Sequence, residues 1–443
     1  MLKPGWFLEY TPEEQLIYKE LVDNIEYIFS KSSYINIQTP AVESNNVLLA
    51  KWWEEASKQI FWLYWLAQWI EDPKSYSLHF DHTIPFARYV IDYYNELSFP
   101  FKKYQIWKVR RWERQQKWRF KEFTQADIDV IWNQEKFDNI FHYDSEIVVV
   151  LYTALLKIKK KLWLNVDFII NINNKKIISS FLDAISKDDN QKNNLAILID
   201  KYEKITKDEF YKESNALWLS YDDIEKLLSL ISSDFDISEL DSISDIVSSD
   251  EYTAWINELK ITISQILAIS ESIWIDMNYK INLWIIRGLD YYTWMVFETF
   301  VSWYEGFWSV CSWGRYDWLT KFLDPKKDCS WVGWSIWVDR LLSLILDKWL
   351  VNKEFSLWPD YFFINFDDTY TDILSILSVF YKKWYKIEIY PFEDKFKKQL
   401  QLANKKWAKN VVIFWEKEKQ DWVIIIKNME TWEEEKLSIN KFI

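Results

Sequence analysis

A basic segment in the first third of the chain is the first candidate for chemistry. Residues 102–121, "KKYQIWKVRRWERQQKWRFK", contain nine Lys or Arg residues and one acid, Glu113, although the whole chain carries a net charge of −13. Aromatic residues interrupt the basic ones, and the segment alternates as strands do, which disfavours a solvated helix face. This local positive charge indicates contact with phosphate groups or nucleic acid. A second basic stretch, Lys382 to Lys409, is explained equally well by a solvated helix.

Arginine is especially suited to phosphate, because its planar guanidinium donates two parallel hydrogen bonds to phosphate or carboxylate oxygens. Arg111 and Arg119 lie in the basic segment, Arg287 opens "RGLDYY", and Arg340 lies in "VDRLL". Taken alone, each would more often be a surface residue, so only the surrounding strings give these arginines weight.

Polar residues in three other strings could hold a small ligand: Asp81, His82 and Thr83 in "FDHT", Gln125 and Asp129 in "QADID", and Tyr291 and Tyr292 in "DYY". On a strand, Gln125 and Asp129 would face the same side, because side chains alternate with a period of two. A carboxylate such as Asp81 is the expected partner of an ammonium group. Outside this setting the two tyrosines would fit a plain amphipathic strand.

The composition is unusual in two residue types. The chain has 30 tryptophans and 5 glycines in 443 residues, whereas about 7% glycine is normal. Many tryptophans stand in polar, turn-like settings such as "KKWYKIEI" and "METWEEEK", where glycine would be expected because it reaches positive φ without steric cost. We hypothesise that most of them are in-frame UGA codons translated as tryptophan but meant as glycine. The codons themselves test this, and the alternative is a truly tryptophan-rich protein.

The bulk composition is that of a globular protein with two or three domains, at 49% hydrophobic and 27% charged residues. The N-terminus "MLKPGWFLEYTPEEQ" lacks an apolar signal core, and no run is long enough to span a bilayer. Cys311 and Cys329 are too few for a disulfide framework or a cysteine-built zinc site. We therefore expect a cytoplasmic location, reduced thiols, no membrane contact and no structural metal.

Three regions are expected to position these residues. Residues 1–150 mix helices, one starting at "TPEE" and running from Pro12 to Ile28, with strands. Residues 155–265 are mostly helical, with acidic, serine-rich joints, and look like an insertion. Residues 280–350 return to strands. From about Leu357 onward, strand-like and helical segments alternate, which predicts a small βαβαβ domain with a partly parallel sheet.

With glycine restored at the tryptophans, four strings in order carry a family resemblance: "SLHFDHTIPFARYV", "VRRGERQQKGRFKEFTQADIDVIG", "IIRGLDYYT" and "VGGSIGVDRLL". These resemble histidyl-tRNA synthetase, a class II aminoacyl-tRNA synthetase, over nearly the whole chain except the helical middle. The second and third strings are highly specific to that family. The resemblance implies that histidine is activated with ATP and then ligated to tRNA(His).

The resemblance also implies residue roles. Arg111 and Arg287 would be catalytic, both at the α-phosphate. ATP would be bound by residues of the second and third motifs: Arg111, Glu113, Arg119 and Arg340. Histidine would be bound by residues of three strings: Asp81, His82, Thr83, Arg111, Gln125, Asp129, Arg287, Tyr291 and Tyr292. Magnesium would arrive with ATP, held mainly by phosphates and a carboxylate or two.

The implied fold is α+β: an antiparallel sheet of six or more strands flanked by helices within a catalytic domain of residues 1–350, with the helical insertion at about 155–265. Residues 358–443 resemble the anticodon-binding domain of several class II synthetases. A homodimer is expected through the first motif, "YINIQTPAVE", where Pro40 and Glu43 match.

The chain departs from the family pattern at several positions. His79 and His82 replace the usual arginine and leucine, Gln115 replaces a proline, and Asp339 replaces a glutamate. The tryptophans are the most serious departure. Those that lie in the motifs, if literal, would crowd the phosphates, and we expect that form to be misfolded or inactive: Trp118, Trp313 and Trp337.

Three alternatives stay open. A non-catalytic, synthetase-like regulatory subunit of histidine biosynthesis would lack the C-terminal domain and tend to lose the catalytic arginines, both of which this chain keeps. A class II synthetase for threonine, proline or glycine would lack "RGLDYY", and the threonine enzyme would need zinc ligands. A nucleic-acid-binding protein without activity would explain the basic segment but not the ordered ATP-site strings.

Overall fold

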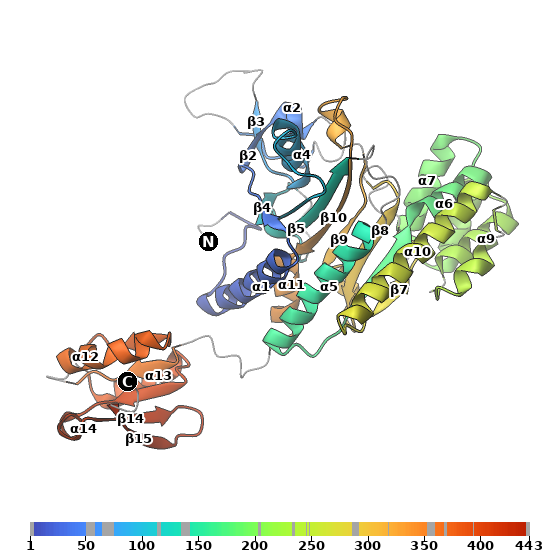
Figure 1. Cartoon of the computed structure of the whole chain (residues 1–443). Coiled ribbons are helices and arrows are strands. Elements are labelled where there is room, and N and C mark those ends of the chain that lie inside the picture. Colours follow the sequence, from blue (N-terminus) through green and yellow to red (C-terminus); the bar gives the residue numbers. More distant parts are fainter. Residues whose placement is uncertain are drawn as a thin grey trace. The chain divides into compact units, whose positions relative to one another are not determined.

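The computed structural model describes most of the chain in fourteen ranges: residues 4–49, 58–63, 75–112, 117–133, 142–202, 205–232, 235–244, 246–247, 249–285, 292–317, 319–351, 359–366, 370–392 and 394–439. Three residues expected at the site lie outside the described residues: Glu113, Arg287 and Tyr291. The chain divides into two compact units, Met1–Val351 and Asn352–Ile443 (Figure 1).

The larger unit is built on an eight-stranded sheet with the order β1-β4-β5-β10-β9-β8-β6-β7. Its strands, in chain order, are β1 (Ile35–Asn36), β4 (Phe101–Arg110), β5 (Glu122–Asn133), β6 (Phe168–Asn174), β7 (Tyr279–Ile281), β8 (Met295–Val301), β9 (Cys311–Gly314) and β10 (Cys329–Trp337). The outermost pairs, β1 with β4 and β6 with β7, are parallel, and the others are antiparallel. The expected α+β fold around a mainly antiparallel sheet is confirmed.

The two strands from the basic and polar strings lie in this sheet. β4 pairs with β5 along its whole length, from Phe101 opposite Ile131 to Arg110 opposite Glu122. β5 is buried on both faces over most of its length, because β10 pairs along its other edge and helices cover it. A central strand of this kind holds its side chains in a fixed register.

Helices flank the sheet (Figure 1). They are α1 (Pro12–Lys31), α4 (Thr83–Asp92), α5 (His142–Leu162) and α11 (Val338–Asp347). Beside them lies a two-stranded antiparallel sheet of β2 (Val42–Ser44) and β3 (Tyr76–Leu78), with the short helix α2 (Asn45–Leu48). α1 contacts α5 and α11. It begins as expected, with a reciprocal capping box between Thr11 and Glu14, but runs one turn beyond Ile28.

The middle of the chain is helical with one exception. Its helices are α6 (Lys175–Ile185), α7 (Asp189–Asp200), α8 (Lys207–Ala216), α9 (Tyr221–Ile231) and α10 (Asp250–Ser272). The range 155–265 expected for the insertion starts inside α5, ends inside α10 and contains β6, which pairs with β7 and β8 of the main sheet. The helical segment therefore starts only after Asn174. The expected boundary missed β6 because its partner β8 lies more than a hundred residues later in the chain.

The smaller unit is a five-stranded sheet with the order β12-β11-β13-β14-β15. Its elements are β11 (Tyr361–Phe363), α12 (Tyr370–Lys382), β12 (Ile387–Ile389), α13 (Phe396–Lys405), β13 (Asn410–Ile413), α14 (Glu416–Asp421), β14 (Val423–Asn428) and β15 (Glu434–Ser438). β11 is parallel to both neighbours, and the last three strands are antiparallel. The expected alternation of strands and helices with a partly parallel sheet is confirmed.

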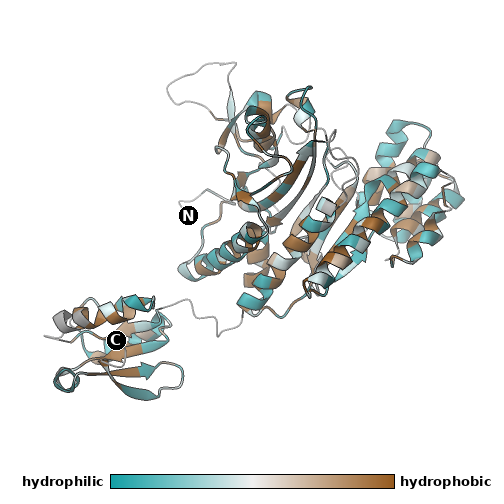
Figure 2. Cartoon of the chain, viewed as in Figure 1, coloured by the Kyte–Doolittle hydropathy of each residue, from teal (hydrophilic) through white to brown (hydrophobic). Residues whose placement is uncertain are grey.

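Each face of the smaller sheet has its own core. Phe362 and Phe363 are adjacent on β11 and point to opposite faces, where they join two separate clusters of buried side chains. In Figure 2 the helices of both units carry hydrophobic and hydrophilic residues in alternation, as expected when one helix face packs on protein and the other meets solvent. Within the described ranges, no helix combines the length and apolar character needed to cross a bilayer.

Candidate active site

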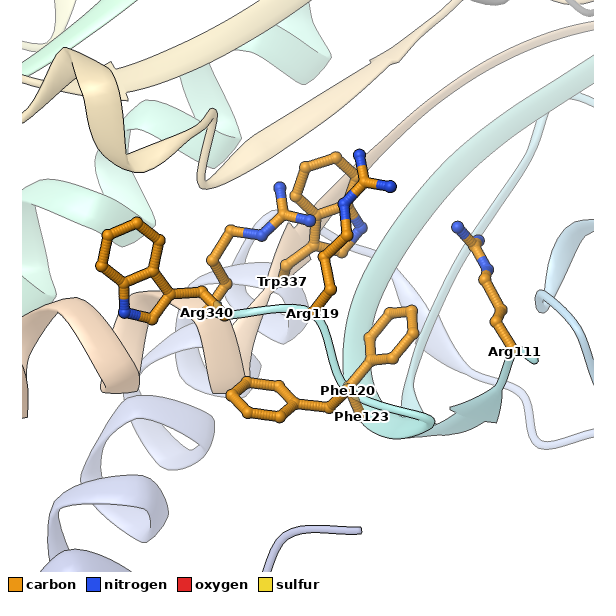
Figure 3. A pocket seen from close by; sticks show the side chains of 7 residues that line it. Arg111, Arg119, Phe120, Phe123, Trp337 and Arg340 are labelled. Atoms are coloured by element: carbon orange, nitrogen blue, oxygen red, sulfur yellow. The ribbon is translucent and has the colours of Figure 1, made fainter. Parts of the chain in front are cut away.

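A pocket in the larger unit gathers three of the expected arginines. It contains about 510 Å³ of empty space, including the part open to solvent, and is lined by Arg111, Trp118, Arg119, Phe120, Phe123, Trp337 and Arg340. Figure 3 shows Arg119 and Arg340 extending into the pocket, with Arg111 standing apart from them. With three guanidinium groups and no carboxylate among its lining residues, the pocket has the charge that suits a polyanion.

Sheet pairing brings these arginines together. Arg111 follows the end of β4, and Arg119 precedes β5, so both belong to one β4–β5 hairpin. Arg340 lies in the first turn of α11, which follows β10 on the other side of β5. The arginines from two distant motifs therefore meet at one end of β5.

Contacts to the backbone hold two of the arginines. The Arg111 backbone N–H donates to the Lys121 carbonyl at 2.9 Å, and its Nε donates to the Phe80 carbonyl at 3.1 Å. The Arg111 guanidinium also lies 4.4 Å from the centre of the Phe80 ring. Arg340 donates from Nη1 to the Ser309 carbonyl at 2.7 Å. These contacts fix the position of each guanidinium group.

Asp339 connects the start of α11 to the rest of the site. Its buried carboxylate accepts hydrogen bonds from the Thr124 backbone N–H on β5 and from the Tyr10 hydroxyl. Burial raises the pKa of the Asp339 carboxyl, and the hydrogen bonds from Tyr10 and Thr124 oppose that shift. Asp339 thus ties the first turn of α11, which contains Arg340, to β5.

A row of polar side chains runs along β5 from the pocket into the core. Gln125, Asp127 and Asp129 alternate with apolar residues, so all three point to the same face, and all are buried. Gln125 donates from Nε2 to the Ser335 hydroxyl at 3.3 Å. Asp129 forms an ion pair with Lys103 of β4, with 2.6 Å between Nζ and Oδ2, and both side chains are almost fully buried.

The far end of this row is closed by Tyr316 and Gly333. The Tyr316 hydroxyl donates to Oδ1 of Asp129. Gly333 of β10 lies directly opposite Asp129, and a Cβ there would stand 2.3 Å from Asp129 Oδ1 and 3.0 Å from the Tyr316 hydroxyl. Glycine at 333 is therefore what leaves room for the carboxylate.

The carboxyl of Asp127 is electrostatically unusual. Burial raises its pKa to about 7, Lys103 lowers it, and the neighbouring charge of Asp129 raises it further. Strongly shifted carboxyl pKa values are common at functional sites. The sequence interpretation named Gln125 and Asp129 but not Asp127 between them, although the strand period of two would have included it. It also missed Lys103, Tyr316 and Gly333.

The string "FDHT" starts α4 beside this row. Asp81, His82 and Thr83 are buried, and Asp81 accepts the Ile84 backbone N–H on Oδ1 at 3.1 Å. Burial raises the pKa of Asp81, and nearby Arg111 lowers it. The His82 ring nitrogen Nε2 lies 3.2 Å from the Trp107 carbonyl oxygen. The three residues thus lie together at the start of α4.

Both histidines of this segment have a lowered pKa, which favours the neutral ring. The rings of His79 and His82 have their centres 6.2 Å apart. Burial lowers the pKa of His79 to about 4, helped by Arg110 and Arg88, and lowers the pKa of His82 as well. The unusual histidines therefore add no positive charge that would repel an ammonium group near Asp81.

Tyr292 is the part of "RGLDYY" that the structure describes. Burial raises the pKa of its hydroxyl, the charge of Glu298 raises it further, and Arg111 and Ser312 oppose the shift. Close packing surrounds the ring, since a Cβ added to Gly314 would lie 3.2 Å from Tyr292 Cδ1. Within the described ranges, no group of three or more His, Cys, Asp or Glu residues could hold a metal ion.

Comparison with known proteins decides the family. The family model described as histidyl-tRNA synthetase matches residues 7–341. The chain belongs to the histidyl-tRNA synthetase family. It is 35% identical over 444 residues to a protein named histidine–tRNA ligase from Finegoldia magna, covering 99% of this chain and 97% of that protein. A protein of the same name from Clostridium acetobutylicum is 33% identical with the same coverage.

Solved structures support the same assignment. The crystal structure of histidyl-tRNA synthetase from Nostoc sp. PCC 7120 superposes with a TM-score of 0.86 at 26% identity, covering 99% of this chain and 97% of that one. A structure from Bacillus halodurans C, titled as an ATP phosphoribosyltransferase regulatory subunit/histidyl-tRNA synthetase, superposes with a TM-score of 0.73 at 17% identity, covering 93% and 97%. At that identity the second match shows the fold alone.

Proposed function

We propose that this protein ligates L-histidine to tRNA(His) in two steps, first forming histidyl-adenylate from histidine and ATP and then transferring the histidyl group to the tRNA 3′ end. The observation that supports this most directly is the junction of two sites on β5. Gln125, which begins the buried polar row, pairs in register with Trp337, which lines the arginine pocket. A polyanion site and a buried polar site thus adjoin, as a reaction between ATP and a small amino acid requires.

The arginine pocket is the proposed place of ATP. In the first step the histidine carboxylate attacks the α-phosphorus, and pyrophosphate leaves with the pair of electrons of the broken P–O bond. Charge concentrates on the phosphoryl oxygens, so cations placed in advance stabilise the transition state. Arg111, with Arg287 from outside the described residues, would act there as the catalytic pair. Arg119 and Glu113 would hold ATP with Arg340, the last at the adenine end.

The buried row is the proposed place of the histidine side chain. Asp129 would accept the imidazole N–H, and Tyr292 would bond the other ring nitrogen beside Tyr291. Gln125 would orient the substrate, while Asp81, His82 and Thr83 would surround its ammonium group. A site that must satisfy both ring nitrogens discriminates against amino acids without imidazole, because its own buried polar groups would be left unpaired.

The remaining partners follow from the same proposal. MgATP would be the substrate form, with the cation held mainly by phosphate oxygens and a carboxylate or two. Residues 358–443, which lie in the smaller unit Asn352–Ile443, would bind the anticodon. The working form would be a homodimer through the segment that holds Pro40 and Glu43. In this structure the Glu43 carboxylate pairs with the Nε of Arg88 at 2.8 Å, so that it is positioned from α4.

ATP–pyrophosphate exchange with each amino acid tests the proposal. It should be measured on the chain as printed and on a chain with glycine at its thirty tryptophans. We expect the chain with glycine to exchange with histidine alone, and the chain as printed to be inactive. Absence of exchange from both forms, each shown to be folded, would instead favour the regulatory relative.

A matched pair of variants then locates the site. Arg111→Ala should lower exchange at least a hundred-fold, which is typical of lost transition-state contacts. Arg110→Ala should leave exchange within about two-fold. Arg110 forms an ion pair with Glu122, with 2.9 Å between Nε and Oε2, and does not line the pocket. Equal losses in the two variants would contradict the assignment.

A further inference from the structure

The tryptophans of this chain occupy a backbone conformation that belongs to glycine. Thirteen described residues other than glycine have positive φ, and twelve of them are tryptophan: Trp6, Trp118, Trp163, Trp218, Trp274, Trp303, Trp308, Trp349, Trp384, Trp407, Trp422 and Trp432. Their φ angles run from 50° to 74°. Phenylalanine and tyrosine, with 28 and 26 residues in the chain, contribute none of the thirteen. Bulk and aromaticity therefore do not explain the pattern.

Six of these tryptophans end helices in one motif. In α10 the N–H of Ile275, the residue after Trp274, donates to the Ser270 carbonyl at 2.9 Å. The equivalent bond closes α5, α8, α11, α12 and α13: Leu164 to Lys159 (2.9 Å), Leu219 to Ser214 (3.3 Å), Leu350 to Ile345 (3.0 Å), Tyr385 to Phe380 (3.3 Å) and Ala408 to Ala403 (3.0 Å). This is the Schellman motif, whose left-handed residue is usually glycine because glycine has no Cβ to clash.

Packing does not account for tryptophan at these helix ends. The side chains of Trp274, Trp384 and Trp349 are 96%, 92% and 90% exposed. An indole ring normally contributes by burying its large apolar surface, and these rings bury almost none. The positions thus carry the steric cost of a large left-handed residue without a compensating contact.

Two other tryptophans of the group lie beside Arg119, which lines the arginine pocket. Trp308 has φ 74° and ψ 156°, a region that is essentially restricted to glycine, and its ring lies 4.5 Å from the guanidinium of Arg119. The ring of Trp118 lines the pocket and its centre is only 3.7 Å from that of Phe307, closer than aromatic pairs normally approach. These indole rings occupy space beside Arg119, one of the residues proposed to bind ATP.

We propose that the working protein carries glycine at these twelve positions. The cells that carry this gene decode as glycine the codons that appear as tryptophan in the printed sequence. Glycine at the helix ends removes the steric cost. Glycine at 118 removes one ring from the lining of the pocket, and glycine at 308 removes the ring that lies against Arg119. Trp118 and Trp308 are thereby positions that determine access of ATP.

Peptide sequencing by mass spectrometry of the protein purified from the cells that carry its gene tests the decoding directly. Peptides that span residues 274 and 349 should contain glycine at both positions. Tryptophan in those peptides would overturn the proposal.

The melting temperature of the larger unit gives a second test with a matched control. The double variant Trp274→Gly/Trp349→Gly should raise it by roughly 2–4 °C. The control places glycine one residue earlier, at Ile273→Gly/Lys348→Gly, where φ is −111° and −103°, and should lower it. A similar fall in both double variants would overturn the proposal.

The activity test rests on the proposed function, whereas the two tests above do not. Trp118→Gly/Trp308→Gly should raise the rate of histidine-dependent exchange at limiting ATP at least ten-fold over the printed chain. Trp218→Gly/Trp274→Gly, at helix ends outside the pocket, should leave that rate unchanged. An unchanged rate from the folded Trp118→Gly/Trp308→Gly protein would overturn the assignment of these two positions.

Discussion

The ion pair between Lys103 and Asp129 makes the most specific prediction about stability. Both side chains are almost fully buried, Nζ and Oδ2 are 2.6 Å apart, and Tyr316 donates to the other carboxylate oxygen. Removing one partner of a buried pair leaves a charge without compensation, which costs about 3–5 kcal/mol. Removing both partners should cost less than the sum of the two single losses, because neither charge is then left without compensation.

The two single variants should differ. In Asp129→Asn, Lys103 can still be compensated by Asp127, whose pKa should fall because the charge of Asp129 is one of the causes that raise it. In Lys103→Met, the two carboxyls lose the neighbouring cation and oppose each other. Lys103→Met should therefore be the more costly variant, at about 4 kcal/mol, with Asp129→Asn nearer 2–3 kcal/mol.

A double-mutant cycle measured by urea unfolding is the assay, with hydrogen exchange of β4 and β5 amides used to assign the transition to the larger unit. We expect a coupling energy of about 2–4 kcal/mol. The neighbouring pair Lys102–Glu146, with side chains 23% and 26% exposed, is the control and should show less than about 1 kcal/mol. Equal coupling in the two pairs, or additive effects at Lys103 and Asp129, would refute the reasoning.

Three further changes have defined outcomes. The pKa of Asp127 is raised to about 7, so its carboxyl contributes stability below about pH 4 that is lost as the pH rises to about 7. Asp127→Asn should remove up to ~1.4 kcal/mol per pH unit from the pH dependence of the unfolding free energy in that range. Urea midpoints of the variant that kept the parent's pH dependence would contradict this. Thr11→Ala breaks the capping box with Glu14 and should destabilise the larger unit by about 1 kcal/mol, measurable as a lower midpoint. Gly333→Ala places a Cβ 2.3 Å from Asp129 Oδ1 and should raise the KM for histidine at least ten-fold with little effect on the KM for ATP; equal changes in both constants would argue against a role confined to the histidine site.

Local strings were enough to predict much of the site. The basic segment and "QADID" became β4 and β5, because alternation with a period of two identifies a strand whatever its partners. "FDHT" became a helix start with its polar residues together. These features depend on neighbours in the chain, so they could be predicted without the fold.

Residues missed by the sequence interpretation are those whose importance comes from distant partners. Tyr316 meets Asp129 across 187 residues of chain, and Gly333 matters only because the register of β10 sets it opposite that carboxylate. Lys103 was counted among the basic residues expected to contact phosphate or nucleic acid, yet it is buried and paired with Asp129. Nothing local distinguishes these three from ordinary strand residues.

The sequence by itself determined the residue types that suit phosphate and imidazole, the strands and helices that carry them, and the excess of tryptophan over glycine as a compositional fact. Each of these depends on chemistry or periodicity within a few residues. Only the tertiary structure decided that Arg111 and Arg340 line one pocket and that Asp129 is paired with Lys103. It also decided which tryptophans have a glycine conformation, because the φ of a helix end and the register of a sheet are set when distant segments pack together.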